Sequence, residues 1–437
     1  MPDDVTTVDA VVVGAGPAGS AAALELARAG RHVVVVERGV FPGAKNVYGG
    51  VVYGRILDEV VPRWWTEVPV QRWVTRRATM LMTPTQALTV DYRSDAWDRP
   101  PYNGMTTYRA DFDSWLAGKA VAAGAKLVTS TVATGLLRDS AGRIAGVRTD
   151  RPGGDIHARI VIACDGANSF LAKEAGLLPR TDSAHTTLGV KETLALPREV
   201  IEERFGLTGD QGLDIEMVGC TSGIPGGGFL YTCLDTVSVG VVVGLDGLAA
   251  AKTRPEELIG QLKAHPAIAP YVRGAELKEY SAHLIPEGGY NAMPRLAIDG
   301  MLVAGDAAFM CLAAGLWLEG VNFAIGAGLA AGRTAAEAIV AGDTSAAGLA
   351  GYRRRLKGSF VLADHKRLRN AAEIVLADRM QQEYPGLACD FVEQIFTVTN
   401  PKPKLGMAKE FFRAVRLNDV KLRHLARDGW QALRAFR

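Results

Sequence analysis

The run VDAVVVGAGPAGS at residues 8–20 decides the fold of this chain. Its β-branched first half predicts a buried parallel strand. The helix formers SAAALELARA at residues 20–29 predict the helix that follows. A GxGxxG motif connects the two elements, so the sequence opens with a strand, a glycine turn and a helix.

Each glycine of this motif has a physical reason. Gly14 permits the tight turn, Gly16 lets a phosphate approach the backbone, and Gly19 lets the helix pack closely on the strand. The helix N-terminus then faces the pyrophosphate of a dinucleotide. A second predicted strand at residues 32–36 ends at Glu37, whose carboxylate can accept hydrogen bonds from the adenosine ribose. The pattern predicts a dinucleotide site but does not separate FAD from NAD.

Two later stretches repeat the strand-then-turn pattern. The predicted strand ARIVIA at residues 158–163 runs into CDGANS, and a strand at residues 302–304 runs into GDAA. In the order GxGxxG, DGxxS and GDA, these motifs resemble the FAD-binding fold of the p-hydroxybenzoate hydroxylase type. The resemblance implies that Asp306 holds the ribityl chain of FAD. The element YRADFD at residues 108–113 is also similar to that family and implies that Arg109 contacts the cofactor. Taken alone, these two residues are equally consistent with a turn aspartate and a surface arginine.

Two further segments resemble a narrower family. FPGAKNVYGG at residues 41–50 and LWLEGVNFA at residues 316–324 are similar to elements of the electron-transfer-flavoprotein:quinone oxidoreductases, especially the FixC branch. The resemblance covers nearly the whole chain. It departs from the family at Tyr48, where serine is common, at Leu318, where arginine is usual, and in CLAA at residues 311–314, which lacks the asparagine–proline chemistry of many relatives.

The second of these segments is expected to open a helix at Gly320 that continues through residues 324–338. Its first amides would point at the pyrimidine edge of the flavin, where negative charge collects on reduction, and would stabilise that charge. The alternative is that Gly320, Gly326 and Gly328 only permit close helix packing.

FAD performs the redox chemistry in such a protein, so we assign no catalytic residue and no metal ligand. The resemblance implies that Lys45, Asn46, Gly49 and Gly50 are neighbours of the flavin ring; the alternative for Lys45 and Asn46 is a solvated loop. The full set of residues that we expect to bind FAD is Gly14, Gly16, Pro17, Ala18, Gly19, Glu37, Arg38, Lys45, Asn46, Gly49, Arg109, Val132, Asp165, Gly166, Gly305, Asp306, Gly320, Val321 and Asn322.

The composition excludes several classes of protein. The 437 residues include 49 Lys and Arg against 47 Asp and Glu, so the net charge of +2 excludes a protein that coats nucleic acid. The five cysteines show no CxxC spacing, so we expect neither disulfides, a structural zinc nor a self-contained iron–sulfur cluster. Residues 226–228 read GGG but lack the flanking pattern of a second nucleotide site for NAD(P)H.

No targeting segment is expected. Residues 1–9 are polar and acidic, which leaves no room for a signal peptide, and no uncharged apolar run of about 18 residues is long enough to span a bilayer. We therefore expect a cytoplasmic protein, with a peripheral position on the cytoplasmic face of the membrane as an alternative.

The predicted fold is α/β (α+β overall). Residues 229–234 and 237–243 are expected to form a hairpin. The predicted domains are a discontinuous Rossmann-like FAD-binding domain over 1–75, 103–183 and 284–345, an inserted mixed-sheet domain on the substrate or quinone side over 76–102 and 184–283, and a helical C-terminal region with a basic tail over 346–437.

The tail differs in charge from the rest of the chain. Residues 401–437 contain ten Lys and Arg but three Asp and Glu, and Leu422, Leu425, Leu433 and Phe436 recur at near-helical spacing. One interpretation is a solvated helix that packs one face on its own domain. The others are a docking site for an acidic ferredoxin or flavoprotein, which we favour, and a contact with anionic lipid.

Three functions are compatible with these residues. The FixC resemblance implies an FAD-dependent oxidoreductase that takes electrons from an electron-transferring flavoprotein, works with a separate ferredoxin-like iron–sulfur subunit and reduces a quinone. The alternative is a geranylgeranyl-reductase-like or aromatic-hydroxylase-like flavoenzyme with a lipophilic substrate. The third is a flavin-bearing scaffold subunit that assembles through its basic C-terminus.

Overall fold

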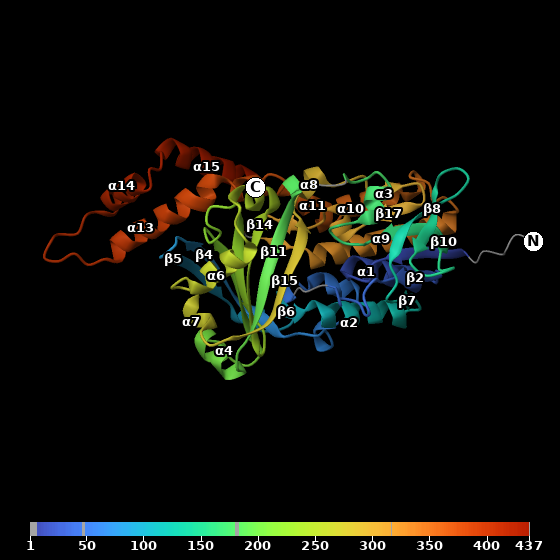
Figure 1. The fold of residues 1–437 in the computed structure, drawn as a ribbon, viewed down its shortest axis with the longest axis horizontal. Helices are drawn as coiled ribbons and strands as arrows, with labels where there is room; N and C mark the ends of the chain where they lie inside the picture. The colour runs from blue at the N-terminus through green and yellow to red at the C-terminus, as the bar shows by residue number, and fades with distance from the viewer. Residues whose placement is uncertain (1–6, 46–48, 180–182, 316, 437) are drawn as a thin grey trace, which may run out of the picture.

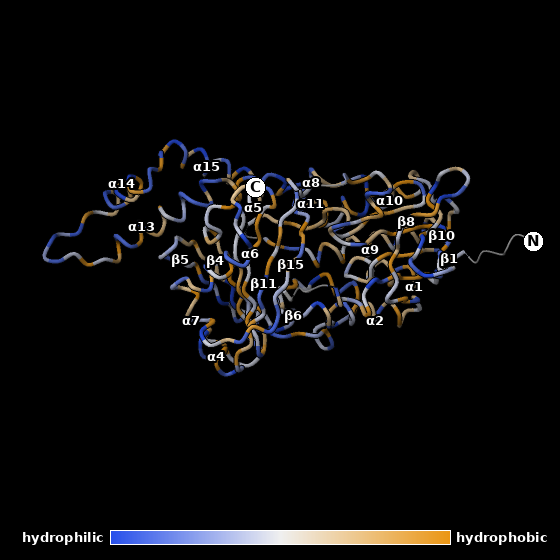
Figure 2. Tube along the Cα trace, in the orientation of Figure 1, coloured by the Kyte–Doolittle hydropathy of each residue, from blue (hydrophilic) through white to orange (hydrophobic). Residues whose placement is uncertain are grey.

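Two large sheets lie side by side in the body of the molecule, and a helical arm extends from one end (Figure 1). The computed structural model describes residues 7–45, 49–179, 183–315 and 317–436. Figure 2 shows hydrophobic residues concentrated along the strands and the central helices, whereas the arm alternates between hydrophilic and hydrophobic stretches. The two sheets therefore hold the main cores.

The first sheet has eight strands and is mainly parallel. A hairpin, β8 (Ala133–Arg138) with β9 (Ile144–Thr149), joins it antiparallel to β10. The main path runs β16 (Ala297–Ile298), β17 (Met301–Val303), β10 (Ile156–Ala163), β1 (Thr7–Val13), β2 (Val33–Val36) and β7 (Lys126–Val128).

The register of this sheet brings the three predicted motifs to one edge. Val13 at the end of β1 lies beside Ala163 at the end of β10, and Ala163 lies beside Val303 at the end of β17. Because these strands are parallel, the turns that follow all three meet at the same carboxyl edge, where α/β sheets bind their ligands. The predicted fold class is confirmed.

Two helices from distant parts of the chain cover this sheet together. The helix α1 (Pro17–Arg28) packs closely on α9 (Val321–Ala341). A Cβ on Gly328 would lie 2.1 Å from the carbonyl oxygen of Ala18, so glycine at this position is required for the contact. Gly328 thus permits close helix packing, which is the alternative considered for these glycines. Gly326 does the same against α11 (Phe360–Arg367).

Among the helices within the described ranges, α9 alone is long and apolar enough by length and composition to cross a membrane. However, 78% of its most apolar stretch is buried inside the protein. Its apolar surface therefore belongs to the core against α1.

The second sheet has nine strands and contains the predicted hairpin as β13 (Gly226–Thr232) with β14 (Thr236–Gly244). A further strand, β5 (Ala87–Arg93), pairs with β4. The main path runs β15 (Glu276–Pro286), β11 (Thr186–Ala195), β14, β13, β12 (Gln211–Val218), β4 (Arg72–Met82), β6 (Met105–Tyr108) and β3 (Gly49–Val52). The strands β3 and β6, from the segments predicted for the FAD-binding domain, are hydrogen-bonded into this sheet, and the predicted domain boundaries stay a prediction.

The two faces of the second sheet differ. Apolar side chains of alternate residues form a core with α4 (Arg198–Phe205) and α6 (Pro255–Ala264), and this core contains Leu213, Ile215 and Val239. The opposite face carries the residues in between, many of them polar. Smaller elements complete the body, namely α2 (Arg109–Ala122), α3 (Phe170–Glu174), α5 (Leu245–Ala251), α7 (Ala269–Val272), α8 (Gly289–Ala292), β18 (Leu312–Ala313) and β19 (Leu318–Glu319).

The C-terminal region is helical, as the sequence predicted. Its last three helices form the arm in Figure 1 around a small core that contains Leu387 and Val415. Arg379 donates hydrogen bonds of 2.5 and 2.8 Å to Asp428 and ties the last helix to the others. The helices are α10 (Gly351–Lys357), α11, α12 (Ala371–Val375), α13 (Tyr384–Phe396), α14 (Met407–Leu417) and α15 (Leu422–Ala435).

Candidate functional site

The glycine turn between β1 and α1 is shaped by contacts that leave no room for side chains. Gly14 has φ +98°, and a Cβ there would lie 2.4 Å from the carbonyl oxygen of Cys164. A Cβ on Gly19 would lie 1.8 Å from the carbonyl oxygen of Gly14. Among the described residues, a Cβ on Gly16 would have only one atom within 4 Å apart from its chain neighbours, namely Nη2 of Arg109 at 3.9 Å. The N-terminus of α1, where Pro17 and Ala18 follow, is therefore open to a phosphate.

Glu37 stabilises this turn through its carboxylate. Oε2 accepts a hydrogen bond of 2.9 Å from the amide of Ala15, and Oε1 accepts one of 2.6 Å from the amide of Gly39. The amide of Thr131 donates to the carbonyl oxygen of Glu37, which places Val132 at the same end of β2. Glu37, Arg38 and Val132, three of the predicted FAD-binding residues, thus lie together, and the carboxylate of Glu37 retains lone pairs for a ribose hydroxyl.

Arg109 is the first residue of α2, and its guanidinium lies beside the glycine turn. Nε and Nη2 donate to the two carboxylate oxygens of Asp113 at 2.7 and 2.8 Å, and Asp113 is fully buried. This bidentate pair fixes the plane of the guanidinium. The backbone of Gly43, with φ +88°, packs against the carbonyl of Arg109, so the loop before the predicted flavin-ring segment also meets this point. The contact of Arg109 with FAD stays a prediction.

Asp306 is placed next to the start of α1 by the turn after β17. Gly305 has φ +68°, and a Cβ there would lie 2.8 Å from Cβ of Ala18. Burial raises the pKa of Asp306, and the nearby positive charges of His283 and Arg109 oppose that rise. Burial likewise lowers the pKa of His283, against the effect of Asp306. Four predicted site residues, Ala18, Arg109, Gly305 and Asp306, and one unpredicted histidine therefore converge on one region.

Asp165 is engaged with the helix that follows it. Oδ1 accepts a hydrogen bond of 2.5 Å from Oγ of Ser169, and Oδ2 accepts one of 3.2 Å from the amide of Leu171. Gly166 has φ +81°, which the turn requires. This arrangement gives Asp165 a role in shaping the turn against Gly14. Its contact with FAD, and that of Gly166, stay predictions.

The segment predicted to lie along the flavin ring is the start of α9. The helix begins at Val321 after the cap residue Gly320, and Nδ2 of Asn322 donates to Oε2 of Glu319. A Cβ on Gly320 would meet only Sγ of Cys311, at 3.7 Å, so close packing does not explain this glycine as it does Gly328. The amides at the helix start are consequently available for negative charge.

The other predicted ring neighbours lie in and before β3. Gly49 and Gly50 pair with Tyr108 and Thr107 of β6. Lys45 is exposed, and Asn46 lies outside the described residues. The structure therefore places the glycines in the second sheet, at its contact with the first.

These groups suit FAD. The open N-terminus of α1 could take the pyrophosphate, Glu37 could accept a hydrogen bond from the adenosine ribose, and Asp306 lies between the turn and the start of α9. A side chain at Gly16 would fill the space where the phosphate would lie. The donor set therefore fits a dinucleotide that extends from β2 to α9.

Sequence reasoning missed a polar layer on the second sheet. Arg77 lies opposite Asp214, Asp214 opposite Tyr231, and Glu216 opposite Phe229. Lys191 on β11 also belongs to this layer, because it pairs with Gly240, which pairs with Phe229. Gly189 lies two residues before Lys191 and pairs with His283, so His283 is on the same face. The charges of Asp306 and Arg109 act on the pKa of His283, so this face adjoins the predicted FAD residues at His283. The alternation DIEMV at residues 214–218 was a signal that could have found the layer.

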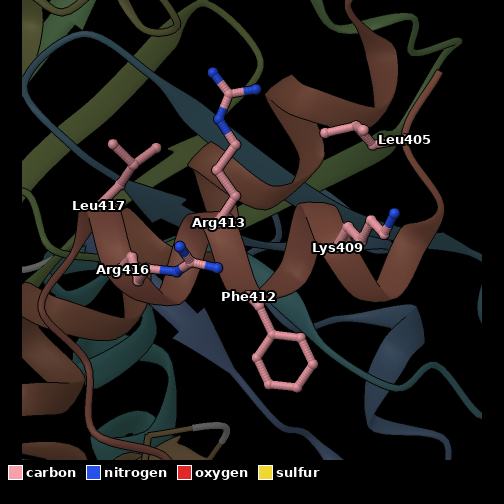
Figure 3. A pocket seen from close by; sticks show the side chains of 6 residues that line it. All are labelled: Leu405, Lys409, Phe412, Arg413, Arg416 and Leu417. Carbon is pink, nitrogen blue, oxygen red and sulfur yellow. The ribbon is translucent and has the colours of Figure 1, made fainter. Parts of the chain in front are cut away.

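The arm carries a basic and apolar surface. Lys409, Phe412, Arg413 and Arg416 recur at helical spacing on α14, and together with Leu405 and Leu417 they line a shallow hollow (Figure 3). On its other side α14 packs Ala414 and Val415 into the small core of the arm. One face of the helix therefore packs on its own domain and the other is exposed.

Within the described part of the chain, no group of three or more His, Cys, Asp and Glu side chains could hold a metal ion. All five cysteines are free thiols.

Comparisons with known proteins match both ends of the chain to families. Residues 7–206 match the FAD binding domain family, and residues 373–437 match the ETF-QO/FixC family C-terminal domain. The chain is 40% identical to Protein FixC of Escherichia coli O157:H7 over 434 residues, which cover 99% of both chains. It is 38% identical to the probable electron transfer flavoprotein-quinone oxidoreductase YdiS of Escherichia coli K12 over 98% of both chains.

Among solved structures, a geranylgeranyl bacteriochlorophyll reductase-like protein from Thermoplasma acidophilum is similar with a TM-score of 0.71 at 19% identity, covering 95% of this chain and 100% of that one. At this identity the similarity concerns the fold. The family matches support FAD as the cofactor.

Proposed function

The chain belongs to the ETF-QO/FixC family of FAD-dependent oxidoreductases, and from that premise we propose that it passes electrons from an electron-transferring flavoprotein to a quinone. FAD, when bound, accepts electrons from a donor and passes them to an acceptor. The protein supplies the position of FAD and the charges around it.

One observation carries this proposal. The ends of β1, β10 and β17 lie in register, so that the glycine turn, Asp165 and Asp306 meet at one edge, and the polar face of the second sheet adjoins that edge at His283. An electron carrier needs such a site, in which a cofactor lies between a binding edge and a second wall. The wall is the place for the quinone in our proposal.

We also propose that the exposed face of α14 docks a small acidic iron–sulfur subunit of the ferredoxin type. Residues 401–437 contain ten basic and three acidic residues, and Arg413 and Arg416 line the same hollow as Phe412. A basic surface with an apolar centre complements an acidic protein with an apolar contact. We propose that the protein works in the cytoplasm, and contact of this same surface with the cytoplasmic face of an anionic membrane is the alternative outcome of the test.

A first experiment tests electron transfer. The purified protein is checked for FAD by its absorbance and then mixed without oxygen with a reduced electron-transferring flavoprotein. We expect the FAD to be reduced and then reoxidised by a short-chain quinone analogue. Rapid NADPH oxidation with an aromatic substrate and oxygen would instead support a hydroxylase-like flavoenzyme. A flavin that exchanges electrons only after the partner is added would support the scaffold function.

A second experiment tests the docking surface. Arg413→Glu with Arg416→Glu should weaken binding of an acidic ferredoxin at least tenfold, whereas Arg353→Glu, an exposed change on α10, should leave it unchanged. Binding is measured by calorimetry. If the double variant binds the ferredoxin normally but loses binding to vesicles that contain anionic lipid, the surface contacts the membrane.

A further inference from the structure

Beside the predicted flavin ring, the second sheet holds a buried cluster that the redox chemistry described so far does not use. Asp214 and Glu216 stand two residues apart on β12 and therefore share one face of the sheet. They are 5% and 8% exposed. Arg77 on β4 lies opposite Asp214, and Tyr53 follows β3.

The contacts in this cluster are close. Nη2 of Arg77 lies 2.5 Å from Oε1 of Glu216, and Nε of Arg77 lies 3.5 Å from Oδ2 of Asp214. The guanidinium carbon lies 5.6 Å from the centre of the Tyr53 ring. Arg77 thus lies between the two carboxyl groups and an aromatic face.

The charges of the cluster do not balance. One guanidinium can neutralise one carboxylate, and the second carboxyl group is buried beside a like charge, so it retains its proton. Burial and the neighbouring charge of Asp214 raise the pKa of Glu216 to about 8, against the opposing effect of Arg77. Burial raises the pKa of Asp214 to about 6. The pair therefore shares one proton at neutral pH.

The location of the cluster connects it with the flavin. Tyr53 comes three residues after Gly50, which is predicted to neighbour the flavin ring, and Glu319 comes directly before Gly320, at the predicted flavin edge. The charge of Glu319 acts on both Tyr53 and Arg77. A residue in or next to each of the two segments predicted to line the ring thus interacts electrostatically with the cluster.

We infer that Glu216, together with Asp214 and Arg77, delivers a proton to the acceptor that is reduced beside the flavin. This inference rests on the proposed function, because it takes a quinone as the acceptor. Conversion of a quinone to a hydroquinone takes up two electrons and two protons. FAD in its anionic reduced form would supply both electrons and one proton, and Glu216 would donate the second proton to a quinone oxygen as its O–H bond breaks and the electron pair stays on the carboxylate. The resulting carboxylate is stabilised by Arg77 and then takes a proton from solvent.

The groups that face Glu216 determine its pH dependence. They are Arg77 on β4, Asp214 on β12 and Tyr53 after β3, with Tyr231 of β13 opposite Asp214. The charge of Glu319 acts on Tyr53 and interacts with Arg77. Burial raises the pKa of Tyr53, so this phenol stays neutral throughout the useful range. Titration near neutral pH therefore belongs to the carboxyl groups.

The experiment follows reoxidation of the chemically reduced, FAD-loaded protein by a short-chain quinone in a single turnover. In the wild type, the rate should fall as the pH rises through about 8, because the donor loses its proton. Glu216→Gln should lower the rate at neutral pH about 100-fold and remove this dependence. Asp214→Asn should move the midpoint to lower pH, since removal of the like charge lowers the pKa of Glu216.

The matched control is Glu192→Gln. Glu192 is also 8% exposed and also ion-paired, to Lys263 at 2.5 Å, but it lies on the helix-covered face of the same sheet. This variant should keep the wild-type rate and pH profile. FAD content should be equal in all four proteins, which shows that each has folded.

An infrared measurement on the oxidised protein needs no turnover. One component of the carbonyl band of protonated buried carboxyl groups should be present at neutral pH, missing in Glu216→Gln and retained in Glu192→Gln. A wild-type protein that reduces no quinone would reject the proposed function. Normal quinone reduction with an unchanged rate in Glu216→Gln, or with no band that depends on Glu216, would reject Glu216 as the proton donor.

Discussion

Oε2 of Glu37 accepts a hydrogen bond of 2.9 Å from the backbone amide of Ala15, and this bond ties the end of β2 to the glycine turn after β1. The other oxygen accepts from the amide of Gly39. Glu37 therefore holds the binding turn in place even before a ribose can reach it. Glu37 thus has a structural function in the protein without FAD, in addition to its predicted function in FAD binding.

The first prediction concerns this residue. Glu37→Ala removes a charged acceptor from two buried amides, so the free energy of unfolding should fall by about 2–3 kcal/mol. FAD should bind at least about tenfold more weakly, because the turn loses its support. Chemical denaturation and flavin titration measure both effects. Glu199→Ala, at an exposed position on α4, should change neither.

The second prediction tests the aspartate after β17. Asp306→Ala should yield protein with little bound FAD, because this carboxyl group lies between the glycine turn and the start of α9. The flavin absorbance per protein gives the answer directly. Asp246→Ala, at an exposed position on α5, should retain a full complement. Stoichiometric flavin in the Asp306 variant would refute the assignment.

The third prediction separates two kinds of glycine. Gly16→Ala places a methyl group in open space above α1 and should weaken FAD binding while leaving the stability of the apoprotein nearly unchanged. Gly328→Ala places one 2.1 Å from the carbonyl oxygen of Ala18 and should destabilise the apoprotein. Thermal unfolding without FAD distinguishes them. Gly118→Ala, with no other part of the protein within 4 Å, should raise the stability slightly, by about 0.5–1 kcal/mol.

The fourth prediction follows from the raised pKa of Glu216. Its value in the folded protein is about 8, against 4.5 as the reference for an exposed carboxyl group. The folded state therefore holds this proton more tightly than the unfolded state, and the stabilisation is complete below pH 4.5 and is lost as the pH rises through about 8. The Glu216→Gln variant should show a smaller loss of unfolding free energy over this range. An identical slope in both proteins would contradict the assignment.

The fifth prediction concerns the arm. Arg379→Met removes the paired hydrogen bonds to Asp428 that hold α15 against the other helices. Amide exchange in α15 should accelerate about tenfold or more, which corresponds to about 1.4 kcal/mol. Exchange in β1 should not change. Arg353→Met, an exposed arginine on α10, is the control.

The sequence was sufficient to predict most of the cofactor half. The strand, turn and helix around Gly14 could be predicted because glycine favours turns and β-branched residues favour strands. The hairpin of β13 and β14 could be predicted from its two strand-like runs. The meeting of Gly14 and Asp306 at one edge depends on the strand order, and it was inferred through the family resemblance. Local pattern alone does not give it.

Other features depend on long-range pairing that no local pattern encodes. The strand β6 is hydrogen-bonded to β4 and to β3, which joins both β6 and β3 to the second sheet. The sequence of neither strand indicates which strand it pairs with. The charged residues Arg77 and Glu216 come from strands far apart in sequence, and their contact exists only through the register of β4 with β12. The proximity of His283 to Asp306 could not be predicted either, because the sequence around a single histidine in a strand does not indicate its neighbours in the fold.

The partnership of α1 with α9 has a consequence for how the protein is made. The helix α1 ends at residue 28, whereas α9 spans residues 321–341 and β17, which joins the same sheet, spans residues 301–303. During translation, β1, α1 and β2 are therefore synthesised long before β17 can pair with β10 and before α9 can pack on α1. We therefore expect the protein to bind FAD only after residues 321–341 have been synthesised.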